Sequence, residues 1–227
     1  MGTKYQLVFN RIKVLSKNDA EYFASKMLEQ PYSEELGWGY CDVQRIDETV
    51  RATLQKRIST TYSVWNEKLQ QVERQNFQIV VEIPFELDFL QNLLFAEGTN
   101  TQLNRVKQSF RQVFWNEFVY EEIHLMPVDY LRILRESSML GSVGELTIND
   151  FQYEDCLIGR YVAKPTSQQE IMSKIGEHAK NIIRAKFYIA INGVESSLHV
   201  TNRSVITLES TEDAKETFVK YLKTKLV

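Results

Sequence analysis

Carboxylates recur at even positions in the segment 82–88, at Glu82, Glu86 and Asp88. Alternate residues of an extended strand point to the same face, and carboxylates that share a face can bind Mg²⁺ for nuclease or phosphotransfer chemistry. Such sites also use a nearby Lys, but none follows at short spacing, and Pro84 interrupts the run. The pattern therefore favours an exposed or edge-strand face, and a metal-dependent nuclease is a distant alternative.

Basic residues form a second candidate site in the first β-rich stretch of the chain. We expect the apolar residues Val50, Ala52 and Leu54 to face the core. Period-2 alternation then places Arg51 and Arg57 on the outer face beside hydroxyl and amide groups. Such a face can hold phosphates and stack bases. The residues predicted to contact nucleic acid are Arg45, Arg51, Lys56, Arg57, Arg160 and Lys164. The competing interpretation is a solvated face with cross-strand pairs.

Aromatic residues supply a third candidate site, for a protein partner. Trp38 and Tyr40 flank a glycine in an aromatic turn, and Trp65 ends the β-rich stretch. Exposed aromatic side chains commonly anchor protein interfaces. We therefore predict that Trp38, Tyr40 and Trp65 form an exposed partner-binding cluster.

Motifs for other chemistries are missing from the sequence. The glycines lack the spacing and the Lys of phosphate-binding loops. The three histidines and two cysteines show no zinc-ligand spacing, and no Ser lies in a nucleophile elbow. We predict no catalytic residue, no metal site and no cofactor.

Composition narrows the classes of protein further. A net charge of −3 argues against a chain that wraps duplex nucleic acid over its whole surface. No apolar run is long enough to span a bilayer, so we expect no membrane association and a cytoplasmic location. Cys41 and Cys156 lie far apart in a chain that needs no crosslink, which predicts two reduced thiols.

Hydrophobic periodicity predicts an α+β fold with mostly antiparallel sheets, each covered on one face by helices. Strands are expected in clusters separated by helices, without the regular alternation of a doubly wound sheet. The polar segment 66–76 is interpreted as a connection between strands. The expected strands are 5–14, 41–45, 50–58, 60–65, 77–83, 90–96, 117–125, 145–151, 157–164, 183–191, 196–201 and 204–209, and the expected helices are 17–30, with Ser16 as its cap, 100–115, 127–136, 167–179 and 211–226.

Domain organisation depends on the serine- and glycine-rich segment 137–144, which we interpret as a loop or linker. It separates an N-terminal α+β region, 1–136, from a C-terminal α+β region, 145–227; one continuous domain is the alternative. An apolar strand followed by a capped amphipathic helix occurs in both regions, at an offset of 112 residues. This recurrence indicates either an internal duplication or the chance repeat of a common unit.

Two functions of different classes fit these observations. The first is a non-catalytic accessory subunit that docks onto other proteins of an intracellular assembly through a sheet face and exposed aromatics, for example in prokaryotic or phage-related machinery. The second is a nucleic-acid-binding module that uses the basic sheet face.

Overall fold

The computed structural model describes residues 2–154, 157–202 and 205–226. Within these residues, eleven strands form one antiparallel sheet. The strands are β1 (Thr3–Val14), β2 (Trp38–Ile46), β3 (Thr49–Asn66), β4 (Gln71–Asp88), β5 (Leu93–Glu97), β6 (Phe118–Glu122), β7 (Leu140–Glu154), β8 (Leu157–Ala163), β9 (Ile182–Ile191), β10 (Val194–Thr201) and β11 (Ile206–Ser210). The helices are α1 (Ala20–Leu28), α2 (Asn100–Phe114), α3 (Pro127–Glu136), α4 (Gln168–His178), the short 3₁₀ helix η1 (Ala179–Asn181) and α5 (Glu212–Leu226).

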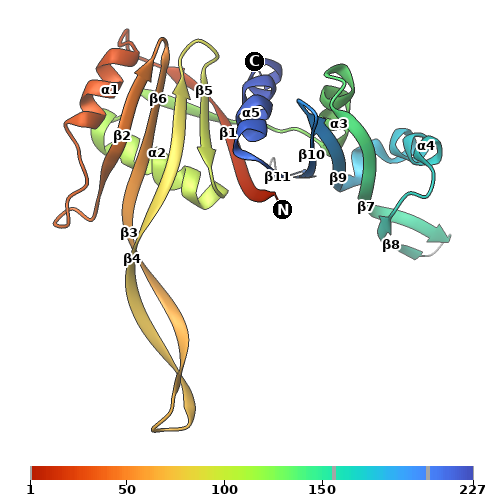
Figure 1. Ribbon diagram of the computed structural model, residues 1–227, viewed down its shortest axis with the longest axis horizontal. Helices are drawn as coiled ribbons and strands as arrows, with labels where there is room; N and C mark the ends of the chain where they lie inside the picture. Colours follow the sequence, from red (N-terminus) through yellow and green to blue (C-terminus); the bar gives the residue numbers. More distant parts are fainter. Residues whose placement is uncertain (1, 155–156, 203–204, 227) are drawn as a thin grey trace.

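Strand β1 lies at the centre of the sheet and joins its two halves. The order across the sheet is β2-β3-β4-β5-β1-β11-β10-β9-β7-β8 (Figure 1). One edge of β1 pairs with β5, and the other pairs first with β11 and then with β6. The prediction of a mostly antiparallel α+β fold is confirmed.

The helices lie on opposite faces of the two halves. Val8 and Ile12 of β1 pack in one core with residues of α1 and α2. Leu7 and Phe9, which alternate with them, pack in a second core with residues of α3 and α5. The expectation of separate sheets, each with helices on one face, is therefore not confirmed. That expectation came from the strand patterns within each half of the chain. These patterns do not indicate that β1 joins the two halves into one sheet.

Local sequence signals position the helices, although α1 begins at Ala20, three residues later than predicted, because Asp19 and not Ser16 is its cap. Thr99 and Gln102 form a capping box at the start of α2, and Asp19 caps α1 through the backbone N–H of Tyr22. These contacts satisfy backbone donors that a helix N-terminus leaves without an intrahelical acceptor. Pro127 begins α3 at a position where its missing N–H costs nothing.

The hairpin of β3 and β4 is much longer than predicted. The two strands pair without interruption from Thr49 and Asp88 to Asn66 and Gln71, so the connection is only residues 67–70. The expected connection 66–76 was wrong because its polar residues lie in a ribbon exposed on both faces, where no apolar alternation marks a strand. Pro84 does not break β4, and it lies just outside the pairing with β5, which begins at Phe85.

Three further expectations concern single segments. The structure assigns the second part of the predicted linker 137–144 to a strand, because β7 begins at Leu140; the division into two regions stays a prediction. Cys41 is a free thiol, whereas Cys156 lies outside the described residues. Among the described helices, none is long and apolar enough to cross a membrane.

Candidate docking arm and charged sheet face

The alternation predicted for the start of β3 is confirmed. Val50, Ala52 and Leu54 are buried beneath α1 and α2. Arg51 and Arg57 are exposed on the opposite face of the strand. The structure therefore places these two guanidinium groups on the outer face, as the nucleic-acid hypothesis requires.

Carboxylates share that outer face. Arg51 Nε donates to Glu86 Oε2 over 2.9 Å, and Gln55 Nε2 donates to Glu82 Oε1 over 3.1 Å. Both partners lie directly opposite on β4. The face therefore carries alternating charges, which weakens the attraction that a phosphate backbone would feel.

The other predicted nucleic-acid residues are dispersed. Arg45 pairs with Glu21 at 2.9 Å on an exposed surface. Lys164, which follows β8, lies 4.0 Å from Glu145, and Arg160 lies within β8. Strand β8 is at the opposite end of the sheet from β2 and β3 (Figure 1). The structure thus brings no single basic surface together from the six residues.

Arg57 is held against the turn that precedes β2. Its backbone N–H donates to the Gly37 carbonyl over 2.7 Å. A Cβ at Gly37, where φ is +69°, would lie 3.2 Å from the Arg57 guanidinium. Glycine thus permits both the left-handed turn and the close approach of the Arg57 side chain. Lys56, the neighbouring candidate, is half-buried and lies opposite Val81.

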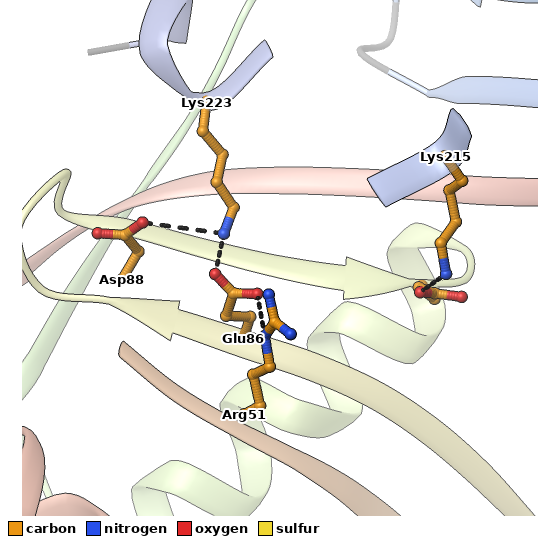
Figure 2. A network of polar contacts seen from close by, with 6 residues as sticks. Arg51, Glu86, Asp88, Lys215 and Lys223 are labelled. Carbon is orange, nitrogen blue, oxygen red and sulfur yellow. Dashed lines mark hydrogen bonds and ion pairs between the residues drawn. The ribbon is translucent and has the colours of Figure 1, made fainter. Parts of the chain in front are cut away.

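A network of buried ions lies where α5 crosses the outer face of β4 and β5 (Figure 2). Lys223 of α5 donates to Glu86 and lies 3.8 Å from Asp88. The side chain of Lys223 is only 7% exposed, and those of Glu86 and Asp88 are 11% and 12% exposed. A second lysine of the same helix, Lys215, donates to Glu97 and Glu212. Sequence reasoning missed Lys223 because no local pattern links it to carboxylates so far away along the chain.

The network borders a cleft of about 840 Å³ between α5 and the outer face of β3 and β4. Two cations, Arg51 and Lys223, neutralise the two carboxylates Glu86 and Asp88 there, so the cluster has no net charge to attract a divalent cation. Among the described residues, no three His, Cys, Asp or Glu side chains are grouped as a metal site would require. These ion pairs stabilise the packing of α5 against the sheet.

Beyond the sheet, the β3–β4 hairpin continues as an arm, which we define as residues Arg57–Val80. β2 pairs with β3 only as far as Lys56, and β5 pairs with β4 only from Phe85. The arm contains ten paired levels and projects away from the rest of the molecule (Figure 1). At a rise of about 3.3 Å per residue, it is roughly 30 Å long.

The two faces of the arm differ in chemistry. One face, here called the apolar face, combines residues of β3 with those directly opposite on β4. Its apolar members are Ile58, Tyr62, Val64, Phe77 and Ile79. The Tyr62 and Phe77 rings lie 5.7 Å apart in an edge-to-face contact. The other face, here called the polar face, carries Arg57, Ser59, Thr61, Ser63, Arg74, Asn76 and Gln78, with Val80 at its base and Trp65 and Val72 at the tip.

The apolar face continues the buried core of the N-terminal half. Leu54 on β3 and Ile83 on β4 are fully buried beneath the helices. Further along the same face, past the end of that cover, Tyr62 is 52% and Phe77 41% exposed. The sequence therefore repeats core-type alternation over a length of strand that the described helices of this chain do not cover.

The aromatic residues predicted to bind a partner divide into two groups. Tyr40 is buried, donates to Ser109 Oγ over 2.9 Å, and has its pKa raised by burial. It is therefore a core residue, which corrects the prediction of its exposure; Trp38 packs edge-to-face against it. Trp65 lies near the tip of the arm, nine residues beyond Lys56, the cross-strand partner of Trp38. The structure separates Trp65 from the other two by about 30 Å.

An apolar tip surrounds Trp65. Trp65 lies opposite Val72, and Leu69 lies in the connecting turn. The three side chains are 58%, 62% and 59% exposed, respectively. Sequence reasoning predicted an exposed Trp65 but missed the apolar tip. Leu69 and Val72 lie in the segment 66–76, which was interpreted as a polar connection.

Neither protein-family models nor curated proteins give a match to this chain.

Proposed function

We propose that this protein is a non-catalytic accessory subunit of an intracellular multi-protein assembly, and that the arm docks it onto a protein partner. One observation carries the proposal: the apolar face of the arm continues the core pattern without cover from the described residues of this chain. Monomeric proteins rarely expose contiguous apolar patches above a few hundred Å² unless the patch serves an interaction. Tyr62 and Phe77 of this face alone expose roughly 200 Å², and Val64 and Ile79 extend the same exposed patch.

Nucleic-acid binding through the charged sheet face is the less supported alternative. Phosphate binding gains its free energy from cations that displace condensed counterions. On this face Glu82 and Glu86 occupy the positions next to the basic residues, and Arg51 already donates to Glu86. A nuclease is supported still less, because the carboxylates Glu86 and Asp88 are neutralised by Arg51 and Lys223.

Co-purification from native cells tests the proposal. A tagged full-length chain is isolated at about 50 mM salt, where phosphate contacts are least screened, and bound protein and nucleic acid are both quantified. We expect a protein at a fixed stoichiometric ratio, reduced by Trp65→Ala. Trp38→Ala, which changes a residue beside the core, is the matched control.

Nucleic acid as the only partner would contradict the proposal. In that case Arg51→Ala with Arg57→Ala should weaken binding equally for unrelated sequences and lower the salt slope by roughly one to two units.

We further propose that the scaffold is an internal duplication. Helices α2 and α5 each have 15 residues and begin 112 positions apart, at Asn100 and Glu212. The strands before them, β5 and β11, pair with opposite edges of β1, and the helices pack on opposite faces of the sheet. A two-fold axis along β1 would relate the units in this way. Superposition of 93–114 on 205–226 by such a rotation is the test.

A further inference from the structure

We infer that the partner of the arm is a protein with an elongated groove that encloses both faces of the arm, rather than a flat surface or a second copy of this chain. The inference depends on the proposed docking function and specifies the shape and chemistry of the partner. The groove has an apolar wall against Tyr62 and Phe77, a hydrogen-bonding wall against the polar face, and an apolar pocket for the tip.

Surface area argues against face-to-face pairing. Two strands about 4.8 Å apart and about 30 Å long present roughly 300 Å² on one face. Two arms stacked by their apolar faces would therefore bury about 600 Å² in total, below the roughly 1,200 Å² of a stable specific interface. Enclosure of both faces, both edges and the tip buries about 1,000 Å² on the arm alone, which brings the total to the range of specific complexes.

Two clefts on the described part of a second copy are also unsuitable for the arm. Its cleft of about 840 Å³ is bordered by charged residues such as Arg51, Glu86 and Lys220. Insertion of an apolar face there would bury these charges without new partners, which is costly. The next cavity has a volume of about 280 Å³ and is lined by polar groups that include Asn10 and His124, so it cannot hold a two-stranded ribbon.

The charge of the arm favours a protein over a nucleic acid. Arg57, Lys68 and Arg74 are its three cations and Glu67 and Glu73 its two anions, a net charge of +1. A small net charge combined with exposed aromatic residues suits a protein interface, where aromatic residues are enriched. A ribbon that tracked a phosphate backbone would need more cations than these.

The polar face makes full enclosure feasible. Thr61 Oγ1 donates to Asn76 Oδ1 over 2.7 Å, which joins the two strands on this side. The other polar groups of the face are hydroxyls, amides and the guanidinium groups of Arg57 and Arg74, and the partner's wall can satisfy them with backbone groups at little cost. The outer edges of both arm strands also lack a neighbouring strand within the described residues, so a groove wall can pair with them.

Photo-cross-linking in native cells tests the inference. A photo-reactive amino acid replaces Phe77 on the apolar face, or Ser63 on the polar face, in the full-length chain. Enclosure predicts that both positions cross-link to the same protein, at residues on opposite walls of one groove. Cross-links from Phe77 alone indicate a flat surface, and cross-links to a second copy indicate self-association; either result overturns the inference.

Affinity measurements with the cross-linked protein provide the second test. Tyr62→Thr with Phe77→Thr keeps β-forming residues in the ribbon while removing both aromatic anchors, and should weaken binding about 30-fold or more. Ser59→Thr with Gln78→Thr, a directly opposite pair on the polar face, is the matched control and should change binding less than about 3-fold.

A shortened arm separates failure of the inference from failure of the proposed function. Residues 59–78 are replaced by Asn-Gly, which closes a tight hairpin after Ile58 and leaves every strand pair of β2 and β5 intact. Loss of the partner supports the inference. Retention of the partner overturns the inference and the docking role of the arm, while the protein remains an accessory subunit, and absence of any protein partner of the full-length chain refutes the accessory-subunit function itself.

Discussion

Replacement of Lys223 by Met should destabilise the protein strongly, although Lys223 is a charged residue near the end of the last helix. Methionine retains the volume of the aliphatic stem and removes only the ammonium group. The carboxylates of Glu86 and Asp88 then remain beneath α5 without the cation that contacts them both.

The magnitude follows from the burial of the three groups. Removal of one partner from a buried ion pair costs about 3–5 kcal/mol, because a buried charge is left uncompensated. Arg51 still contacts Glu86 at 2.9 Å, and Asp88 still accepts from the backbone N–H of Gln91 at 2.9 Å. The remaining contacts place the expected loss at the lower end, about 3 kcal/mol.

Urea denaturation of full-length variants measures this loss. A decrease of 3 kcal/mol should lower the transition midpoint by about 1 M at an unchanged slope. Lys225→Met is the matched control, because Lys225 lies on the same helix and its ion pair with Glu136 is 35% and 51% exposed. This control should leave the midpoint unchanged within experimental error.

Two outcomes would refute the reasoning. The first is equal behaviour of the Lys223 and Lys225 variants, which would mean that solvent screens the Lys223 network. The second concerns rescue: Glu86→Gln with Asp88→Asn in the Lys223→Met background removes the unpaired charges and should recover most of the stability. Absence of recovery would assign the loss to packing of α5.

Three further predictions concern the core, the thiol and acid stability. Phe110→Ala and Leu222→Ala each remove a fully buried side chain and should each cost about 2–5 kcal/mol in urea denaturation; a cost below about 1 kcal/mol would contradict core packing. Cys41 should be reduced in freshly purified protein and should react with iodoacetamide roughly 100-fold more slowly at pH 8 than an ordinary thiol, because burial raises its pKa to about 11; a disulfide by intact mass would overturn this. Lys215 donates to Glu212 and lowers the pKa of the Glu212 carboxyl below the ordinary 4.5. The stability that this ion pair contributes is therefore complete above pH 4.5 and is lost as the pH falls through the folded-state pKa of Glu212. Glu212→Gln should therefore reduce the loss of stability below pH 4.5, and an unchanged pH profile would refute the contribution.

The sequence alone determined the local elements of this protein. The alternation of Val50, Ala52 and Leu54 predicted the buried face of β3, and the capped amphipathic pattern over 100–115 predicted α2. These signals are local, because a strand's side-chain direction and a helix cap depend on residues within a few positions of each other.

The arm shows where local pattern was insufficient. The exposed ribbon 66–76 has no buried face, so its sequence carries no alternation to distinguish it from a loop. Only the pairing of β3 with β4 makes residues 71–76 part of a strand and leaves 67–70 as the turn. For the same reason, the apolar tip at Trp65, Val72 and Leu69 could not be predicted.

Tertiary structure decided which charged and aromatic residues act together. Lys223 reaches Glu86 across 137 positions of sequence, and no local spacing encodes such a contact. Tyr40 enters the core because Ser109 of α2 satisfies its hydroxyl, whereas Trp65 stays exposed at the tip of the arm. The position of β1 at the centre of a single sheet placed the helices of the two halves on opposite faces, because alternate side chains of one strand face opposite cores.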